Sequence, residues 1–255
     1  MASLGMHIMR FYLGTHRTQW LHKLENIPLF VSHRILKKYK TLQPATTNWC
    51  LDSGGFTELS MYNGWKTTPD KYVKAIRRYI DEIGRMQWAS PQDWMCEPFM
   101  NEKTGLTVRQ HQLKTVTNYL ELKYIADDLP IIPVLQGWTL DDYLHCVDMY
   151  NAVGINLEEY ETVGIGSVCR RQATGEAENI VYRLQPIRLH GFGMKTTAVH
   201  RFGHLLASSD SMAWSFGGRM KPDPTCPKKS CANCLHYALA WRKKVLNPTQ
   251  PTIFA

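Results

Sequence analysis

The sequence predicts an α/β protein, a (β/α)8 barrel of the TIM type, on three observations. Eight short apolar runs alternate with segments of helical periodicity, the order expected of a parallel sheet built from βα units. The length of 255 residues suits one such barrel. Polar and glycine residues follow several of the runs, where a barrel places its active site. An open, doubly wound sheet has the same alternation, and periodicity alone does not separate the two folds.

The predicted strands are the short apolar runs themselves. They cover Arg10–Gly14, Leu29–Ser32, Trp49–Asp52, Gln87–Ser90, Ile131–Leu135, Thr162–Gly166, Arg188–Gly191 and Leu205–Ser209. Three longer segments between them predict helices, because their apolar residues recur at spacings of three and four. These helices are Pro69–Arg85, Val108–Asp127 and Leu140–Val153.

The end of the chain carries the most specific local motif, Cys226-x4-Cys231-x2-Cys234-x-His236. Three thiolates and an imidazole suit tetrahedral Zn²⁺, and a site with no open position is structural. His204 and His200 are the other candidates for the fourth ligand. A short helix follows over Leu235–Val245. We therefore predict a catalytic barrel over residues 1–220 and a zinc-binding loop and helix, packed on the barrel, over 221–255.

The charge of the chain favours a polyanionic partner. The formal net charge is +8 and the isoelectric point is about 9.1, and neutralising phosphates releases counterions. Solubility alone is the other explanation, so charge does not decide. A basic cluster is either a solvated helix face or a patch that attracts phosphates; it comprises Arg34, Lys37, Lys38 and Lys40.

The location of the protein is predicted from segments that the sequence lacks. It shows no apolar stretch long enough for a transmembrane helix and no layout typical of a signal peptide at Met1–Arg10. Three of its seven cysteines cluster in the metal motif and four are scattered. This pattern favours a reducing cytoplasm over a disulfide framework.

Two aspartates at predicted strand ends are the candidate catalytic pair. Asp52 begins the segment Asp-Ser-Gly-Gly-Phe, and Asp210 lies in Ser-Ser-Asp-Ser after the last predicted strand. Each alone is explained by a turn or a helix N-cap. Together they suit glycosidic chemistry, in which one carboxylate attacks or stabilises the sugar and a second group moves a proton at the leaving group. Beside Asp52, Ser53 and Gly54 are candidate substrate contacts, because glycine lets a planar base approach the backbone.

As a set, these strand-end motifs resemble the tRNA-guanine transglycosylase superfamily, and more closely its phage and bacterial DNA branch, the deazaguanine DNA transglycosylases. The similar segments run from about Trp49 to Cys234. They are Asp52-Ser-Gly-Gly-Phe56, Pro91-Gln-Asp-Trp-Met-Cys96, Leu135-Gln-Gly-Trp138, Gly164-x-Gly166-Ser-Val-Cys-Arg-Arg-Gln172 and Asp210-Ser-Met-Ala-Trp-Ser215. One departure concerns Asp93 and Cys96, which two residues separate here, whereas one residue separates the carboxylate and cysteine of the tRNA enzymes.

The resemblance implies a zinc-bearing TIM barrel that exchanges guanine in a polynucleotide for a free 7-deazaguanine without ATP. It implies that Asp210 attacks C1′ to give a covalent intermediate and that Asp52 is the general acid/base for the leaving and entering bases. It also implies which groups hold the base edges: Asp93, Gln136 and the backbone at Gly137 and Gly166.

Other residues near the strand ends have two open interpretations. The target base must leave its stack to be reached. Phe56, Trp94, Trp138 and Trp214 either stack on it or pack the barrel. The pairs Arg170–Arg171 and Arg219–Lys221 either hold phosphates or are solvated surface groups.

Two functions of different classes are compatible with these observations. The first is base exchange on DNA, with the same exchange on tRNA as its nearest alternative; the short chain after the cysteine motif favours DNA. The second is a non-catalytic zinc-containing nucleic-acid-binding protein whose aspartates are caps. The aspartates discriminate between them, because a binding protein would tolerate Asp52→Asn and Asp210→Asn.

Overall fold

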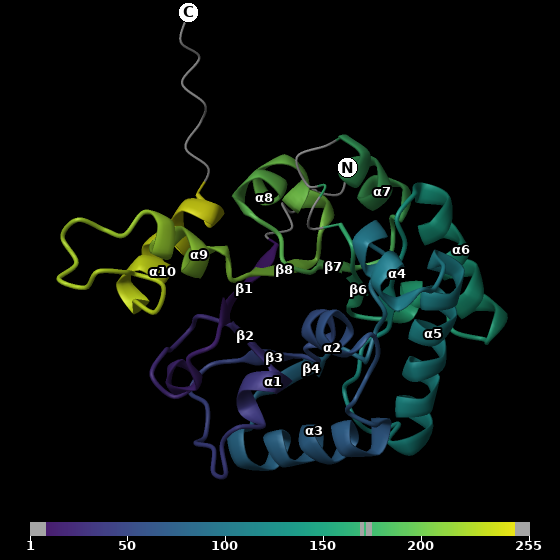
Figure 1. The fold of residues 1–255 in the computed structure, drawn as a ribbon, viewed down its shortest axis with the longest axis horizontal. Helices are drawn as coiled ribbons and strands as arrows, with labels where there is room; N and C mark the ends of the chain where they lie inside the picture. The colour runs from purple at the N-terminus through teal and green to yellow at the C-terminus, as the bar shows by residue number, and fades with distance from the viewer. Residues whose placement is uncertain (1–8, 169–170, 172–174, 248–255) are drawn as a thin grey trace, which may run out of the picture.

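Eight parallel strands form a single curled sheet in the computed structural model, which describes residues 9–168, 171 and 175–247. The strand order is β4-β3-β2-β1-β8-β7-β6-β5. A parallel bridge between Ala89, in β4, and Ile131, just before β5, joins the two ends of the sheet. Helices follow one another around these strands (Figure 1). The predicted TIM-like α/β barrel is therefore confirmed.

All eight predicted strands are present. They are β1 Arg10–Thr15, β2 Leu29–Ser32, β3 Trp49–Asp52, β4 Met86–Ala89, β5 Val134–Leu135, β6 Val163–Ile165, β7 Leu189–Gly191 and β8 Ser208–Ser211. The predicted bounds of the last strand are wrong, because Gly203–Leu205 forms a 3-10 turn. The chain pairs with β1 and β7 only from Ser208 onward. The buried residues of β8 are polar, so no apolar run reveals this strand in the sequence. Asp210 lies within β8 and not after it.

The helices are α1 His33–Leu36, α2 Gly55–Tyr62, α3 Pro69–Ile83, α4 Pro98–Thr104, α5 Val108–Ile125, α6 Leu140–Ala152, α7 Gly175–Arg183, α8 Thr196–Phe202, α9 Ala213–Met220 and α10 Leu235–Leu246. The three long predicted helices correspond to α3, α5 and α6. Capping boxes at Thr107 and Thr139 satisfy the first backbone N–H groups of α5 and α6. In the described part of the chain, no helix combines the length and apolar character needed to cross a membrane.

The pleat of the strands separates two apolar cores. Successive side chains point to opposite faces, so Tyr12 points into the barrel while Leu13 points toward the helices. The inner cluster is aromatic and small; it contains Tyr12, Phe30, Cys50, Trp88 and Ile132. This inner cluster fills the barrel below its C-terminal end, so a substrate meets a closed floor.

Helix α10 packs on α8, α9 and β1. Its Ala238 and Val245 belong to the outer core, and the ring of Trp241 lies 6.0 Å from that of Phe11. The predicted short helix after the cysteines is thus present and packed on the barrel. The boundary at residue 221 stays a prediction.

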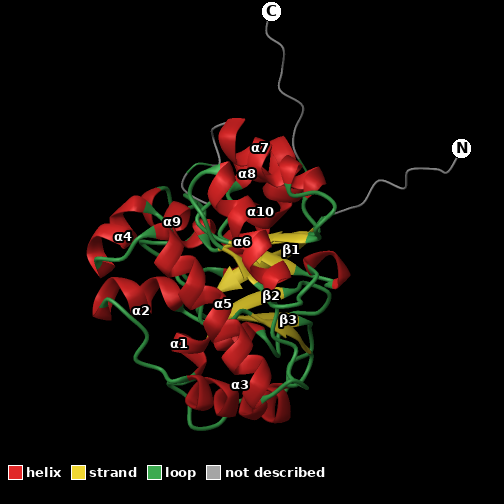
Figure 2. Cartoon of the chain, turned by 90° about the vertical axis from the view of Figure 1, so that its right-hand side faces the viewer, coloured by secondary structure: helices red, strands yellow, loops and turns green. Residues whose placement is uncertain are grey.

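Three short helices gather at one end of the barrel (Figure 2). Helix α2 starts three residues after β3 ends, α4 follows the loop after β4, and α9 starts two residues after β8 ends. Each therefore lies at the C-terminal ends of the strands, where a barrel carries its active site.

We expect Gly218→Ala to destabilise the protein. A Cβ on Gly218, in α9, would lie 2.7 Å from the backbone oxygen of Cys231. A backbone atom cannot swing aside as the end of a flexible side chain can. Overpacking of this kind costs about 1–3 kcal/mol, and thermal unfolding measures it. The matched control is Gly217→Ala in the same helix, whose Cβ meets only the flexible hydroxyl of Tyr237 at 3.3 Å. The control should unfold at the same temperature or higher, and equal losses in both variants would contradict this packing.

Candidate active site and metal cluster

A cavity of about 480 Å³ opens among the C-terminal ends of the strands. It is lined by residues in or just after all eight strands, and four of its lining residues are carboxylic acids, contributed by β3, the loop after β4, and β8. These acids are Asp52, Asp93, Glu97 and Asp210. Phe30 and Phe192 contribute aromatic surface to the same cavity. A flat, hydrogen-bonding ligand matches such a lining, because aromatic faces stack on rings while carboxylates accept from ring N–H groups.

Asp210 is held in place through one of its two oxygens. Its side chain is buried in β8, and Oδ1 accepts a hydrogen bond from the backbone N–H of Gly193 at 3.0 Å. His190 Nε2 lies 3.3 Å from the same oxygen, and His190 Nδ1 lies 2.8 Å from Ser208 Oγ. If the Ser208 hydroxyl donates to Nδ1, a neutral His190 donates Nε2–H to Asp210. This arrangement fixes the carboxylate while both contacts converge on Oδ1.

Asp52 ends β3 and lines the same cavity. Its Oδ1 accepts the N–H of Gly54 at 3.0 Å, a bond made possible by the left-handed φ of +82° at that glycine. Burial raises the pKa of Asp52, and the charge of Asp210 adds to the rise, although the Gly54 N–H, the Ser32 hydroxyl and Arg34 act against it. This environment stabilises the protonated form of Asp52 relative to that of a solvent-exposed aspartic acid. A carboxyl group in this state suits proton donation.

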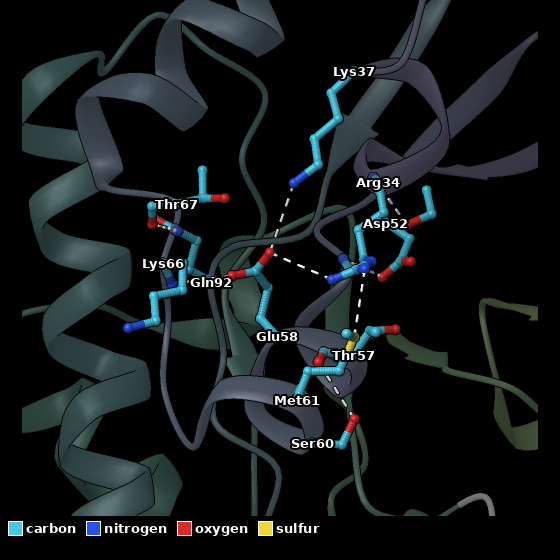
Figure 3. Close-up of polar contacts among 12 residues, drawn as sticks. Arg34, Lys37, Asp52, Thr57, Glu58, Ser60, Met61, Lys66, Thr67 and Gln92 are labelled. Atoms are coloured by element: carbon cyan, nitrogen blue, oxygen red, sulfur yellow. Dashed lines mark hydrogen bonds and ion pairs between the residues drawn. The ribbon is translucent and has the colours of Figure 1, made fainter.

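Arg34 links the mouth of the cavity to a buried glutamate. Figure 3 shows Arg34 and Lys37 reaching from the α1 region toward Glu58 of α2, close to Asp52. The Glu58 carboxylate lies 3.5 Å from Arg34 and 3.7 Å from Lys37 and accepts the N–H of Lys66 at 3.0 Å. Arg34 also covers Gly54, so a side chain at Gly54 would clash with it at 2.7 Å. Of the predicted basic cluster, Arg34 and Lys37 therefore have defined partners beside the site.

Asp93 begins a buried polar chain. Gln136 donates its Nε2–H to Asp93 Oδ2 at 2.6 Å, and its Oε1 lies 2.8 Å from the hydroxyl of Ser167. The same hydroxyl lies 3.0 Å from Glu97 and accepts the N–H of Cys96 at 2.8 Å. Burial raises the pKa of Asp93 to about 7, opposed by the Gln136 hydrogen bond and assisted by the charges of Asp52 and Glu97. Asp93 therefore changes its protonation near neutral pH.

Two glycines of β6 and its end make room for this chain. A Cβ on Gly166 would lie 2.2 Å from the Gln136 amide, and a Cβ on Gly164 would lie 2.5 Å from the ring of Phe192. The Gly166 N–H donates to Leu135 O, and its carbonyl accepts the Tyr143 hydroxyl at 2.6 Å. The glycine pair thus lets Gln136 and Phe192 approach the backbone closely.

The structure brings five predicted site residues to the cavity: Asp52, Asp93, Gln136, Gly166 and Asp210. Other predicted contacts lie behind or beside it. The N–H of Ser53 donates to Ser90 Oγ at 2.8 Å, and Gly54 supports Asp52. Gly137 packs against α6, where a Cβ would meet Asp142 and Tyr143.

Arg171 lies away from the cavity lining. Its guanidinium stacks over the ring of Trp138 at 4.0 Å, donates to the Trp138 carbonyl and pairs with Glu176 at 2.7 Å. Arg170 lies outside the described residues. The roles predicted for these two arginines as phosphate contacts stay predictions.

Of the four aromatic residues with open interpretations, Phe56 lines the cavity. Trp214 is fully buried, with its Nε1–H donated to Gly14 O at 2.8 Å. Trp94 packs edge-on against His111.

The thiol of Cys96 is buried and lies near the carbonyls of Trp94 and Val108, at 3.7 and 3.9 Å. Burial raises the pKa of this thiol.

The loop between α9 and α10 forms a candidate metal site. The ligand atoms of Cys226, Cys234 and His236 lie within 4.8 Å of one another, and the side chain of Cys231 contacts both other thiols. The Sγ atoms of Cys226 and Cys234 are 3.8 Å apart. Two thiolates bound about 2.3 Å from a tetrahedral Zn²⁺ would be separated by roughly that distance. A hydrogen bond from the backbone at Lys228 lowers the pKa of Cys226, which favours the thiolate.

The candidates for the fourth metal ligand, His236 and His200, lie in different surroundings. His236 belongs to the cysteine cluster, and its Nε2 lies 3.9 Å from Asp223. His200 instead lies within hydrogen-bonding distance of the carbonyls of Lys244 and Val245 on α10. His236 is thus the histidine that shares the candidate site with the thiols.

Sequence reasoning missed four residues of the site. His190, Glu97, Ser167 and Phe192 each hold or border one of the predicted residues. A signal exists for His190, a histidine in an apolar run that pairs in register with Ser208 of the next strand. None exists for Glu97, since its burial depends on the loop after β4.

The chain matches a described family over nearly its whole length, although no curated protein matches it. The family model is that of DpdA, DeoxyPurine in DNA protein A, and it matches residues 7–254. This range includes every strand, the cavity and the cysteine cluster. The match confirms the predicted resemblance to the deazaguanine DNA branch. The chain therefore belongs to the DpdA family, which is implicated in deazapurine modification of DNA.

Proposed function

We propose that this protein is a transglycosylase that exchanges a guanine base in DNA for a free 7-deazaguanine, such as 7-cyano-7-deazaguanine. The observation that carries the proposal is the convergence of Asp52 and Asp210 on one cavity that also holds the Asp93–Gln136 pair. Two differently held carboxylates suit glycosidic chemistry, and the hydrogen-bonded pair suits the polar edge of guanine. DNA is the favoured polynucleotide because the chain belongs to the DpdA family.

The first step is attack on the sugar. We assign it to Asp210 Oδ2, because Oδ1 accepts the hydrogen bonds from Gly193 and His190. A new bond forms between Oδ2 and C1′, and the bond from C1′ to the guanine nitrogen breaks, with its electron pair leaving on the base. His190 and the Gly193 N–H orient the carboxylate without reacting themselves.

The second role is proton transfer at the base. Asp52 enters the cycle protonated, which its burial favours, and gives its proton to the departing guanine. The resulting carboxylate then removes the ring N–H proton of the entering 7-deazaguanine, whose nitrogen attacks C1′ and displaces Asp210.

Recognition of the base is assigned to the polar chain behind the cavity. The carboxylate of Asp93 accepts from the ring N–H and the amino group of guanine, and Gln136 fixes its orientation. The carbonyl of Gly166 is a further acceptor at the edge of the cavity. Adenine lacks that paired donor edge, so the set discriminates against it.

The cysteine cluster is proposed to hold a structural Zn²⁺ through Cys226, Cys231, Cys234 and His236. The spacing of the thiols and the histidine beside them support this donor set. A four-ligand zinc supplies folding energy and takes no part in base exchange. It would fix the loop against α9, where Cys231 N donates to Gly218 O at 2.8 Å.

Replacing either aspartate should abolish exchange without unfolding the protein. Asp210→Asn removes the nucleophile and Asp52→Asn removes the transferable proton, so we expect losses of at least about a thousandfold. Purified protein is incubated with labelled guanine and either duplex DNA or tRNA, and incorporation is counted. Asp148→Asn, an exposed carboxylate on α6, is the matched control and should label DNA like the wild type.

Three results would argue against this assignment. Labelling by Asp210→Asn excludes the proposed nucleophile. Labelling of tRNA and not DNA by the wild type excludes the proposed substrate. DNA binding with no exchange by the wild type favours the non-catalytic binding protein.

The affinity for the free base should rise with pH. The pKa of Asp93 is raised to about 7, so the acceptor form that binds guanine grows as pH increases from 6 to 8. Calorimetric titration with the free base should show several-fold tighter binding at the higher pH. Asp93→Asn should bind weakly at both pH values, and a step of the same size in that variant would assign the titration to another group.

Zinc removal should destabilise the fold of the protein, because the zinc takes no part in a catalytic step. We expect about one Zn²⁺ per chain by elemental analysis, and a lower unfolding temperature after chelation. Cys231→Ser and His236→Ala should lower zinc content, whereas Cys146→Ser, on α6, and His204→Ala should retain it. Zinc retention by His236→Ala with loss in His204→Ala would reassign the fourth ligand.

A further inference from the structure

Exposed apolar side chains are concentrated around the mouth of the cavity. Among the described residues, twelve large apolar side chains are exposed, and seven of them lie on α2, α4, α9 or the residue before α9. These seven are Phe56, Met61, Tyr62, Phe99, Met212, Phe216 and Met220. Exposed apolar groups gathered at one place mark an interaction surface. We call this set the apolar rim.

Helix α9 carries one side of the apolar rim. Met212, Phe216 and Met220 are spaced four residues apart and are 44%, 66% and 63% exposed. Residues at this spacing share one helix face. The opposite face is buried, with Trp214 packed on the barrel and Gly218 packed against Cys231 of the cysteine loop. Met212 also lines the cavity, so the stripe begins at the cavity and runs outward.

Helices α2 and α4 carry the other side of the apolar rim. Phe56 is 46% exposed and lines the cavity, and the ring of Phe99 lies 6.2 Å from it. The three helices lie at the same end of the barrel (Figure 2). Apolar side chains from β3–α2 and from β8–α9 therefore border the cavity that holds the carboxylates.

The charges beside the apolar rim favour a polyanion as its occupant. The segment from residue 211 to 222 contains Arg219 and Lys221 and no carboxylate, and both cations are exposed. Across the cavity, Lys37 is partly exposed beside Arg34. Apolar groups flanked by cations match a partner that carries phosphates and also stacked rings, and DNA is that partner.

We propose, on the basis of the proposed function, that the apolar rim inserts into the base stack of duplex DNA and holds the strands open around the nucleotide in the cavity. Asp93 and Asp210 are buried at 8% and 6% exposure, so a base stacked in a duplex cannot reach them. Extraction leaves a gap and two unstacked neighbours. Phe216 on one side, and Phe99 beside Phe56 on the other, cover those faces, as apolar wedges do in proteins that kink DNA.

The test compares one circular DNA in its double-stranded and single-stranded forms, so the unknown sequence context is the same in both. The variant is Phe99→Ala with Phe216→Ala, which removes one exposed ring of the apolar rim on each side of the cavity and changes no residue of the cavity lining, and labelled guanine reports the exchange rate. Lost stacking should lower the rate on the duplex by about tenfold to a hundredfold. The single strand needs no opening, so its rate should change by less than about twofold. The ratio of the duplex rate to the single-strand rate therefore falls.

The control is Tyr182→Ala, an aromatic residue of α7 that is 63% exposed on the ring of helices away from the mouth. Its rate ratio should equal that of the wild type. A ratio equal to that of the wild type overturns the wedge, whether neither rate falls or both fall equally. A wild type that labels only single strands also overturns it. A wild type that labels neither form overturns the proposed function itself, so the two failures are distinguishable.

Discussion

The gathering of four carboxylic acids in one cavity, three of them buried and Asp52 half-buried, is the constraint on which the site depends. Each acid needs donors, because an uncompensated buried charge is costly. Asp210 receives the Gly193 N–H and lies beside His190, and Asp52 receives the Gly54 N–H. Asp93 receives the Gln136 amide. Several of these donors come from loops at strand ends, so the barrel both gathers the acids and supplies what stabilises them.

The glycines follow from the same constraint. Gln136 reaches Asp93 only because Gly166 has no side chain, since a Cβ there would lie 2.2 Å from the amide. Gly54 bonds Asp52 from a left-handed conformation and lies under Arg34. The glycine pair Gly164-x-Gly166 is thus explained by packing around a polar chain and the ring of Phe192.

The sequence predicted much of this arrangement because alternating apolar runs and helical spacing are local signals. All eight strands and the three long helices follow from them. The last strand was misplaced because Ser208–Ser211 is buried but polar, and burial of polar residues depends on neighbours far along the chain. Glu97 was missed for the same reason: the partner that holds it, Ser167, is contributed by the end of a different strand.

The different environments of Asp52 and Asp210 explain how a base exchange can complete its cycle in a secluded site. In the proposed reaction, the proton that Asp52 gives to guanine is replaced by the one that the entering 7-deazaguanine loses. Asp52 therefore ends protonated, the form that its burial favours, and no proton has to be exchanged with solvent. Asp210 likewise ends as the free carboxylate when the new glycosidic bond forms. In the proposed reaction, the chemistry itself thus restores the resting states of both groups, so one cavity suffices for both halves of the exchange.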